Sequence, residues 1–237
     1  MHSPIRYTGQ PALVTSTGGA YSPENAEGEE LLPERLCTQE NLKIWRWLVN
    51  KGITNAMTGL SQMVGRDITV TSLDQRRLPV DRLVEFPGKP EVPAIGVDLT
   101  IEGDASGHLM LIYRPHIALR LVDLQLGLPE GSTIEMDEIE YSILGEMGNI
   151  TGSFFLNALA DSTSLVLMPS PPSVLTDTIE GIMSVPLTMI VNENNMTLAV
   201  KAAFAIGEKD LAGTFLVLPG MDLVETILSP RTANYLR

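Results

Sequence analysis

The order of hydrophobic and polar positions along the chain predicts a long helix, several strands and a short helix, and then the same succession again. In residues 38–64, Ile44, Trp45, Leu48 and Ala56 recur at helical spacing on one face, while polar side chains occupy the other. A threonine stands at the start of this run and is an acceptable N-cap, so we expect the first long helix to begin there.

The segments that follow are rich in β-branched residues or alternate between apolar and polar, which is typical of strands. They cover residues 67–72, 94–101 and 107–113, and the turn sequence GDASG separates the last two. Residues 117–128 return to helical spacing and end near a glycine, after which a Pro-Glu-Gly-Ser linker closes the first half of the chain.

The second half begins with a helix predicted over residues 137–160, where Asp137 and Glu140 form a plausible capping box. Strands are expected at residues 163–168, 181–191, 196–204 and 213–218, with turns at 193–195 and 207–210 and a short helix at 221–228.

The two halves have the same order of elements and can be aligned. An offset of 99 residues places Asn50 on Asn149, Lys43 on Ser142 and Trp47 on Glu146. We therefore predict a flexible N-terminal extension over residues 1–36, rich in Gly, Pro, Ser, Thr and Glu, followed by one domain over residues 37–237. That domain is expected to be an α/β unit with a pseudo-two-fold axis, made of two repeats at about 38–128 and 133–230.

Composition narrows the possible functions. Sixteen Lys and Arg against 29 Asp and Glu give a formal net charge of −13, which argues against a nucleic-acid binder and against docking on anionic membranes. A single cysteine and three histidines at unrelated positions exclude a disulfide framework and give no metal site. No segment has the length and apolarity of a signal peptide or a membrane span, so we expect no membrane insertion and a cytoplasmic location.

The predicted second long helix carries a narrow polar stripe. Ser142, Glu146, Asn149 and Ser153 fall within it, opposite an apolar side that includes Met147. A Glu and an Asn at i and i+3 present a carboxylate and an amide side by side. This pair is the main indication of function, although an exposed Glu and Asn taken alone are usually solvated surface.

The stripe extends into a longer motif: Ser142, three residues, Glu146, two residues, Asn149, 22 residues and then Pro172. This spacing, with the surrounding LGEMGNITGSFFLNALA and PSPPSV, resembles the signature of the CheC, FliY and CheX family of response-regulator phosphatases. The resemblance covers residues 38 to about 230. It implies an α/β (α+β) fold of duplicated halves, with a central, largely antiparallel sheet flanked by two long helices.

The family resemblance implies that the protein is a hydrolase, which removes the aspartyl phosphate of a phosphorylated CheY-type receiver in chemotaxis signalling. An acyl phosphate is already reactive, so the main task is to hold a water in line, which an Asn amide can do. Asn149 is therefore expected to position the water, and Glu146 to pair with a lysine of the receiver. The resemblance implies no cofactor on this chain, and Mg²⁺ on the receiver. Ser142 is a candidate for a peripheral hydrogen bond, and Pro172 is expected to shape the surface beside the helix.

The first half departs from the family pattern. Lys43 and Trp47 stand where Ser142 and Glu146 stand in the second half, and only Asn50 remains. We interpret this first site as degenerate. Trp47 is then either a partner hot spot or covered by the tail or the helix end.

Several alternatives stay open from the sequence. No flagellar-switch-type domain follows residue 237, which favours a free-standing CheC-like protein, for which a CheD-type deamidase is a possible second partner. The main rival is a non-catalytic binding module for a response regulator or a flagellar component. An unrelated α/β enzyme is a weaker alternative, because no Gly-rich phosphate loop or nucleophile elbow is present. His108 and His116 are expected at turn or surface positions.

Overall fold

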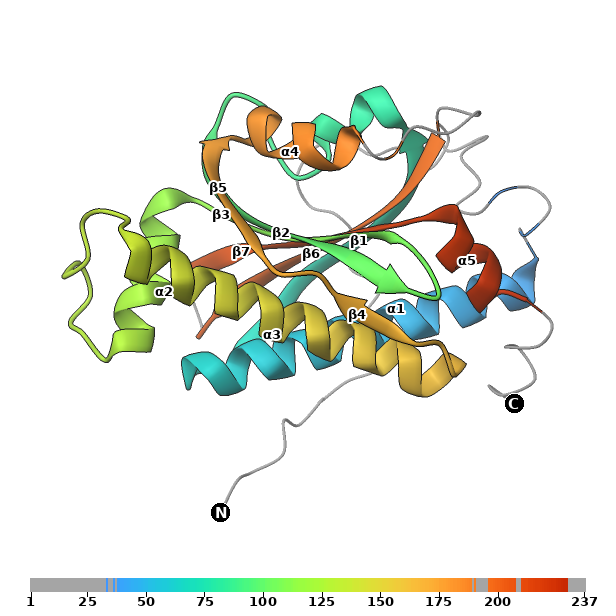
Figure 1. Cartoon of the computed structure of the whole chain (residues 1–237), viewed down its shortest axis with the longest axis horizontal. Helices are drawn as coiled ribbons and strands as arrows, with labels where there is room; N and C mark the ends of the chain where they lie inside the picture. The colour runs from blue at the N-terminus through green and yellow to red at the C-terminus, as the bar shows by residue number, and fades with distance from the viewer. Residues whose placement is uncertain are drawn as a thin grey trace, which may run out of the picture.

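The domain is built around one antiparallel sheet with helices on both faces (Figure 1). The computed structural model describes residues 33, 36, 38–188, 190, 196–207 and 210–229. Its helices are α1 (Gln39–Val64), α2 (Pro115–Leu126), α3 (Glu138–Thr163), α4 (Ile179–Leu187) and α5 (Met221–Ile227), with a 3-10 helix, η3, at Val80–Glu85. Its strands are β1 (Ile68–Pro79), β2 (Pro93–Gly103), β3 (Gly107–Tyr113), β4 (Leu167–Pro169), β5 (Ser173–Thr178), β6 (Met196–Ile206) and β7 (Asp210–Pro219). The predicted α/β fold class is confirmed.

The sheet order shows the predicted pseudo-two-fold symmetry. The strands are arranged β1-β6-β7-β3-β2-β4, with β5 also paired to β2, and every pairing is antiparallel. If the halves are exchanged, so that β4 and β5 stand for β1, β6 for β2 and β7 for β3, the order reads the same from the other end. The edge strands of each half therefore pair with a strand of the other half: β1 pairs with β6, and β4 and β5 pair with β2.

Two hydrophobic cores lie on opposite faces of this sheet. The larger core receives α1, α2, α3 and α5, and the smaller core receives η3 and α4. The strands supply both cores because neighbouring side chains point to opposite faces: Val97 and Leu99 reach the larger core, whereas Ala94 reaches the smaller.

The long helices α1 and α3 lie side by side on the larger core, running in opposite directions (Figure 1). Their close approach depends on glycines of α1. A Cβ on Gly52 would lie 2.6 Å from the ring of Phe155, and a Cβ on Gly59 would lie 2.6 Å from the ring of Phe154. The two phenylalanines of α3 thus pack directly on the backbone of α1.

Helix α3 begins as predicted. The Asp137 side chain accepts from the backbone at the third helical position, and the backbone N–H of Asp137 donates to Oε2 of Glu140 at 2.9 Å, so the capping box is confirmed. Helix α1 likewise begins after Thr38, whose hydroxyl accepts from the N–H of Asn41 at 3.1 Å. The direction in which both long helices leave their N-termini is therefore set by local sequence.

The face of α3 that meets the sheet is lined by glycine. A Cβ on Gly148 would overlap Cγ1 of Val97 on β2, and a Cβ on Gly152 would lie 3.3 Å from Leu109 on β3. By contrast, a Cβ on Gly145 would make ordinary contact with the ring of Pro172, at 3.4 Å. The contact between Gly148 and Val97 therefore sets the distance between α3 and the sheet.

We predict opposite stability changes for alanine at two of these glycines. Gly148→Ala is expected to destabilise the domain by about 1–3 kcal/mol, because the buried, β-branched Val97 cannot move aside easily. Gly145→Ala is expected to stabilise it by about 0.5–1 kcal/mol, because alanine favours the helix and its Cβ has room. Urea denaturation of both variants checks this, and equal shifts of their midpoints would contradict it.

Two predicted elements are wrong, for local reasons. Residues 181–191 were expected to form a strand, but α4 occupies Ile179–Leu187 and buries Ile179, Ile182, Met183 and Pro186 at helical spacing. A short apolar run does not distinguish the two structures, and the cap from Thr178 to the N–H of Gly181 decides for helix. The strand expected at residues 163–168 starts later, because α3 continues to Thr163 and ends on Ser164 in the left-handed conformation (φ 59°).

The remaining predicted segments agree with the structure or lie outside it. Strand β1 continues to Pro79, well beyond the predicted residues 67–72, because it pairs with β6 along its whole length. Apart from residues 33 and 36, the predicted extension over residues 1–36 lies outside the described residues, and so does the predicted turn at 193–195.

Candidate functional site on the second long helix

The predicted polar stripe lies on the outer side of α3. Ser142 and Glu146 are exposed, and Asn149 and Ser153 are half-buried, while Met147 is fully buried. Within the part of the chain that the structure describes, the side chains of Glu146 and Asn149 form no hydrogen bond or ion pair. A carboxylate and an amide are thus displayed together with their bonding capacity unused, which is what recognition of a partner requires.

Pro172 reaches this surface through a bulge in the sheet. Ile101 of β2 pairs with Pro169 at the end of β4, and Asp98 of β2 pairs with Ser173 at the start of β5. Two residues of β2 therefore lie opposite the three residues that connect β4 to β5. The bulge is held by Ser170, which donates its N–H to the carbonyl of Thr100 and accepts the N–H of Thr100 on its hydroxyl, each at 2.9 Å.

The result of this bulge is that the Pro172 ring packs beside Gly145, one residue before Glu146. This is the position that the motif predicts for it, beside the helix. A second contact joins α3 to the same strand, where the Tyr141 hydroxyl lies 3.1 Å from the Thr176 hydroxyl. Neither Gly145 nor Tyr141 was among the predicted site residues. Each directly precedes a motif residue in the sequence, Gly145 before Glu146 and Tyr141 before Ser142, and only this adjacency could have indicated them.

The first half has the same bulge in the equivalent place. Thr71 is the extra residue of β1, between Val70 paired with Phe204 and Ser72 paired with Ala203. The offset of 99 that aligns the helices places Val70, where the first bulge begins, on Pro169, where the second begins. It also puts Leu73, which is paired with Ala202, where Pro172 stands. Both halves therefore have a bulge that begins at the equivalent position, but the residue equivalent to Pro172 lies within the paired strand of the first half.

On α1 the equivalent side chains are engaged differently. The Asn50 amide donates to the carbonyl of Arg46 at 2.8 Å, whereas the Asn149 amide has no such partner among the described residues. Trp47 is 49% exposed, so the described helices leave it accessible; the alternative that the tail covers it concerns residues outside the described ones. Lys51 lies over the Trp47 ring, with Nζ 5.2 Å from its centre, and donates to the Ser162 hydroxyl at 2.7 Å.

A separate polar pair lies inside the sheet. His108 is only 4% exposed, and its Nδ1 lies 3.2 Å from Oδ1 of the buried Asp98. The expectation of a turn or surface position for His108 is therefore wrong, because the residue lies on β3 and pairs across to β2. His116 lies on α2, as part of a different feature.

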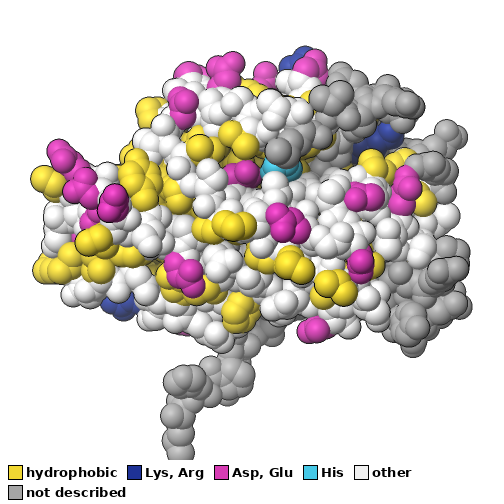
Figure 2. Space-filling model, in the orientation of Figure 1, with side chains coloured by type: hydrophobic (Ala, Val, Ile, Leu, Met, Phe, Trp, Pro, Cys, Tyr) yellow, Lys and Arg dark blue, Asp and Glu magenta, His cyan; other side chains and the backbone are white. Residues whose placement is uncertain are grey.

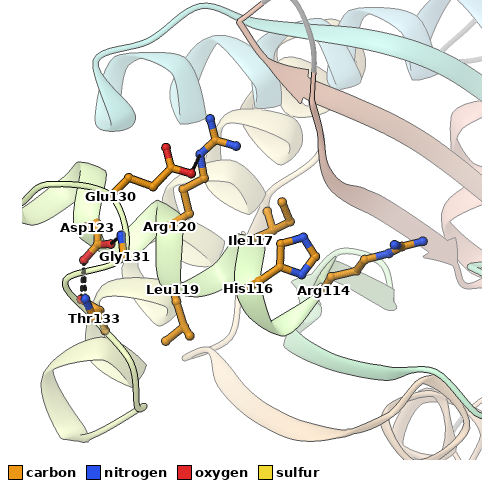
Figure 3. Close-up of a pocket in the computed structure, with 9 residues that line it drawn as sticks. All are labelled: Arg114, His116, Ile117, Leu119, Arg120, Asp123, Glu130, Gly131 and Thr133. Atoms are coloured by element: carbon orange, nitrogen blue, oxygen red, sulfur yellow. Dashed lines mark hydrogen bonds and ion pairs between the residues drawn. The ribbon is translucent and has the colours of Figure 1, made fainter.

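That feature is a pocket between α2 and the loop that follows it (Figure 3). Its rim includes His116, Arg120 and Glu130, and the last two form an ion pair with Nε 3.3 Å from Oε1. None of the predicted site residues lines this pocket. The residues of the polar stripe therefore lie on the outer side of α3, away from this pocket.

Beneath this loop, the carboxylate of Asp123 is buried and accepts four hydrogen bonds. They come from the N–H groups of Gly131 (2.7 Å), Ser132 (3.2 Å) and Thr133 (2.8 Å) and from the Thr133 hydroxyl (2.6 Å). Burial by itself raises the pKa of Asp123, but the bonds from Thr133, Gly131 and Ser132 outweigh it and lower the pKa below its ordinary value. Asp123 thus holds the connection between the two halves.

Two properties of the described residues bear on metal binding and on membrane insertion. No group of three or more His, Cys, Asp and Glu side chains there is arranged to hold a metal ion. None of the helices in that part of the chain is both long enough and apolar enough to cross a membrane.

Comparison with known proteins shows which proteins this chain resembles. The model of the CheC-like family matches residues 139–175, the stretch that contains Glu146, Asn149 and Pro172. The chain is also 28% identical over 193 residues to the CheY-P phosphatase CheC of Bacillus subtilis (strain 168), covering 80% of this chain and 92% of that protein.

Solved structures agree in fold. Thermotoga maritima FliY has a TM-score of 0.61 at 20% identity, over 84% of this chain and 96% of that one. The FliM middle domain of H. pylori has a TM-score of 0.55 at 16% identity, over 81% and 98%. The predicted resemblance to the CheC, FliY and CheX family is confirmed.

Proposed function

We propose that the protein hydrolyses the aspartyl phosphate of a CheY-type receiver in chemotaxis signalling, at one active site on α3. The observation that carries the proposal is the pair of unengaged side chains, Glu146 and Asn149, within the segment that matches the CheC-like family. The similarity to a CheY-P phosphatase over most of the chain supports the same substrate.

The proposed step is an in-line attack of water on the phosphorus of the acyl phosphate. The bond from phosphorus to the aspartyl oxygen breaks, the receiver regains its carboxylate, and inorganic phosphate leaves. Asn149 accepts a hydrogen bond from the water on its amide oxygen and points its N–H groups toward the phosphoryl oxygens. The water is thereby held in a reactive position, so the amide needs no change of charge.

Glu146 has a different role, because a carboxylate is repelled by a phosphoryl group. We assign it to a lysine beside the phosphorylated aspartate of the receiver, which it anchors through a charge-assisted hydrogen bond. Ser142, one turn earlier on the same stripe, adds a peripheral contact, and Pro172 supports the helix from the sheet. The Mg²⁺ that phosphoryl transfer uses is supplied by the receiver. A CheD-type deamidase is a second partner that the family resemblance implies.

The test is the release of phosphate from phosphorylated receivers. Each CheY-type receiver of the source organism is phosphorylated with a small-molecule donor in Mg²⁺, and its decay is followed with and without this protein. We expect acceleration with at least one of them. If no receiver is dephosphorylated faster but one binds, the alternative of a non-catalytic binding module is correct instead.

Glu146→Gln separates anchoring from chemistry in the same assay. The amide cannot form an ion pair with the lysine, so KM for the receiver is expected to rise by about tenfold, which corresponds to the difference between a charged and a neutral hydrogen bond. The matched control is Trp47→Gln at the equivalent position of α1, for which we expect no change in hydrolysis. A fall in kcat with KM unchanged in Glu146→Gln would reject the anchoring role.

A further inference from the structure

Exposed hydrophobic side chains gather at the connection between α2 and α3. Of the eight large hydrophobic residues that the described part of the chain exposes, four fall within residues 126–139. These are Leu126, Leu128, Ile134 (79% exposed) and Ile139 (64% exposed), which we call the apolar patch. Figure 2 shows hydrophobic side chains interspersed with acidic ones over this end of the molecule. Exposed apolar residues that are grouped in this way mark interaction sites more often than scattered ones.

The apolar patch is part of a firmly held segment. Asp123 fixes residues 131–133 through its four hydrogen bonds, Met136 packs against the larger core, and the capping box fixes the start of α3. The exposed side chains are therefore presented by an ordered backbone, which lowers the entropy that a partner loses on binding.

The apolar patch is continuous with the proposed active site. Ile139 lies three residues before Ser142 and seven before Glu146, so all three fall on one stripe of α3 together with Asn149. A partner that places a phosphoryl group at Asn149 must cover a surface of about 800 Å² to bind stably, which extends well beyond two side chains. Among the described large hydrophobic residues, Ile139 is the one that α3 exposes.

The charge around the apolar patch defines the partner further. Between Arg120 and Lys201 the sequence has no lysine or arginine, but it has eleven Asp and Glu residues. Of these, Glu135 and Glu138 are exposed and lie beside the apolar residues, and Glu130 is exposed but pairs with Arg120. A surface that is apolar at its centre and acidic at its rim attracts an apolar side chain surrounded by basic ones.

We propose that the apolar patch is the docking surface for the phosphorylated receiver, which presents there an apolar side chain flanked by Lys or Arg. The proposal rests on the proposed function, because the receiver is the substrate of the adjacent site. Docking at the apolar patch sets affinity and the choice among receivers, while Asn149 and Glu146 act on the phosphoryl group and its neighbouring lysine.

The test uses the full chain and replaces two side chains of the apolar patch. In the double variant Ile134→Thr and Ile139→Thr, KM for the phosphorylated receiver is expected to rise about tenfold with kcat within twofold of the parent. The matched control is Val166→Thr with Met168→Gln, two exposed residues beyond the far end of α3, for which KM is expected to stay unchanged. An unchanged KM in the first variant, or an equal rise in both, overturns the proposal.

Binding measurements distinguish this proposal from the proposed function. Affinity is measured for each receiver held in its activated state by beryllofluoride and Mg²⁺, so that no hydrolysis is needed. Weaker binding of the apolar-patch variant supports docking here even if the parent hydrolyses nothing, an outcome that rejects only the proposed function. Equal binding of parent and variant, or no binding of any receiver to the parent, rejects the docking surface.

The dependence of binding on ionic strength tests the acidic rim separately. Binding of the parent is expected to weaken as ionic strength rises, and the variant Glu135→Gln with Glu138→Gln is expected to show a smaller salt dependence. Neither residue belongs to the capping box, so the fold is retained. The same salt dependence in parent and variant would show that the partner does not bring basic residues to this rim.

Discussion

Replacing Asn149 with alanine is expected to slow phosphate release from the phosphorylated receiver by about a hundredfold or more, because no other group would hold the attacking water in line. The fold should not suffer from this change. Asn149 lies in the interior of α3 and alanine has the higher helix propensity, by about 0.5 kcal/mol. A variant that is as stable as the parent, binds the receiver and does not hydrolyse its phosphate is thus the expected result.

The pseudo-symmetry of the domain supplies the control. Asn50 occupies the same position on α1, but its amide already donates to the carbonyl of Arg46 and no acidic residue stands where Glu146 would be. Asn50→Ala is therefore expected to leave the rate of phosphate release unchanged. If Asn50→Ala and Asn149→Ala lose activity equally, both halves hydrolyse phosphate and the interpretation of the first site as degenerate is wrong.

Replacing Asp123 with asparagine is expected to lower the free energy of unfolding by about 3 kcal/mol at pH 7, which is the scale for breaking a buried, charge-assisted hydrogen-bond network. An asparagine oxygen can accept some of the four hydrogen bonds, but its NH₂ group would face donors of residues 131–133. The control is Asp161→Asn, an exposed residue of α3, for which a change within about 0.5 kcal/mol is expected.

The contribution of Asp123 also has a defined pH dependence. Because its pKa is lowered in the folded state, the folded protein holds fewer protons than the unfolded chain in acid. The stabilisation is complete above the unfolded pKa of about 3.9 and is lost as the pH falls through the lower, folded value. Urea denaturation at pH 7 and at successively lower pH should show parent and Asp123→Asn converging in acid. A constant difference between them would show that the carboxylate charge is not what stabilises the loop.

Local signals were sufficient to predict the elements that carry the site. The capping box at Asp137 and the helical spacing of the apolar residues fix both the start of α3 and which of its sides faces out. The distant Pro172 was recognisable only as part of a spaced motif. Its physical role, contact with Gly145 through a bulge, depends on a pairing between strands of different halves.

Other features could not be predicted from the pattern of hydrophobic and polar residues. Helix α4 buries an apolar run that would also suit a strand, and Ser164 ends α3 in a conformation usually left to glycine. Asp123 lies on α2, and its burial as an acceptor depends on the loop of residues 131–133, which returns over it. The apolar patch could not be predicted either, because the exposure of Leu126, Leu128, Ile134 and Ile139 depends on how the connection between α2 and α3 packs.

The close contact at Gly148 makes the position of α3 depend on the first half of the chain. Helix α3 rests on Val97 and Leu109, which belong to the half whose own polar stripe has lost its acid. The half with the incomplete motif thus supports the helix that carries the complete motif, so its interior residues are constrained even where its surface residues can vary. Residues 38–128 therefore cannot be removed without loss of the strands on which α3 packs, although they lack the complete polar motif. Their removal would take away the support that fixes the position of Asn149.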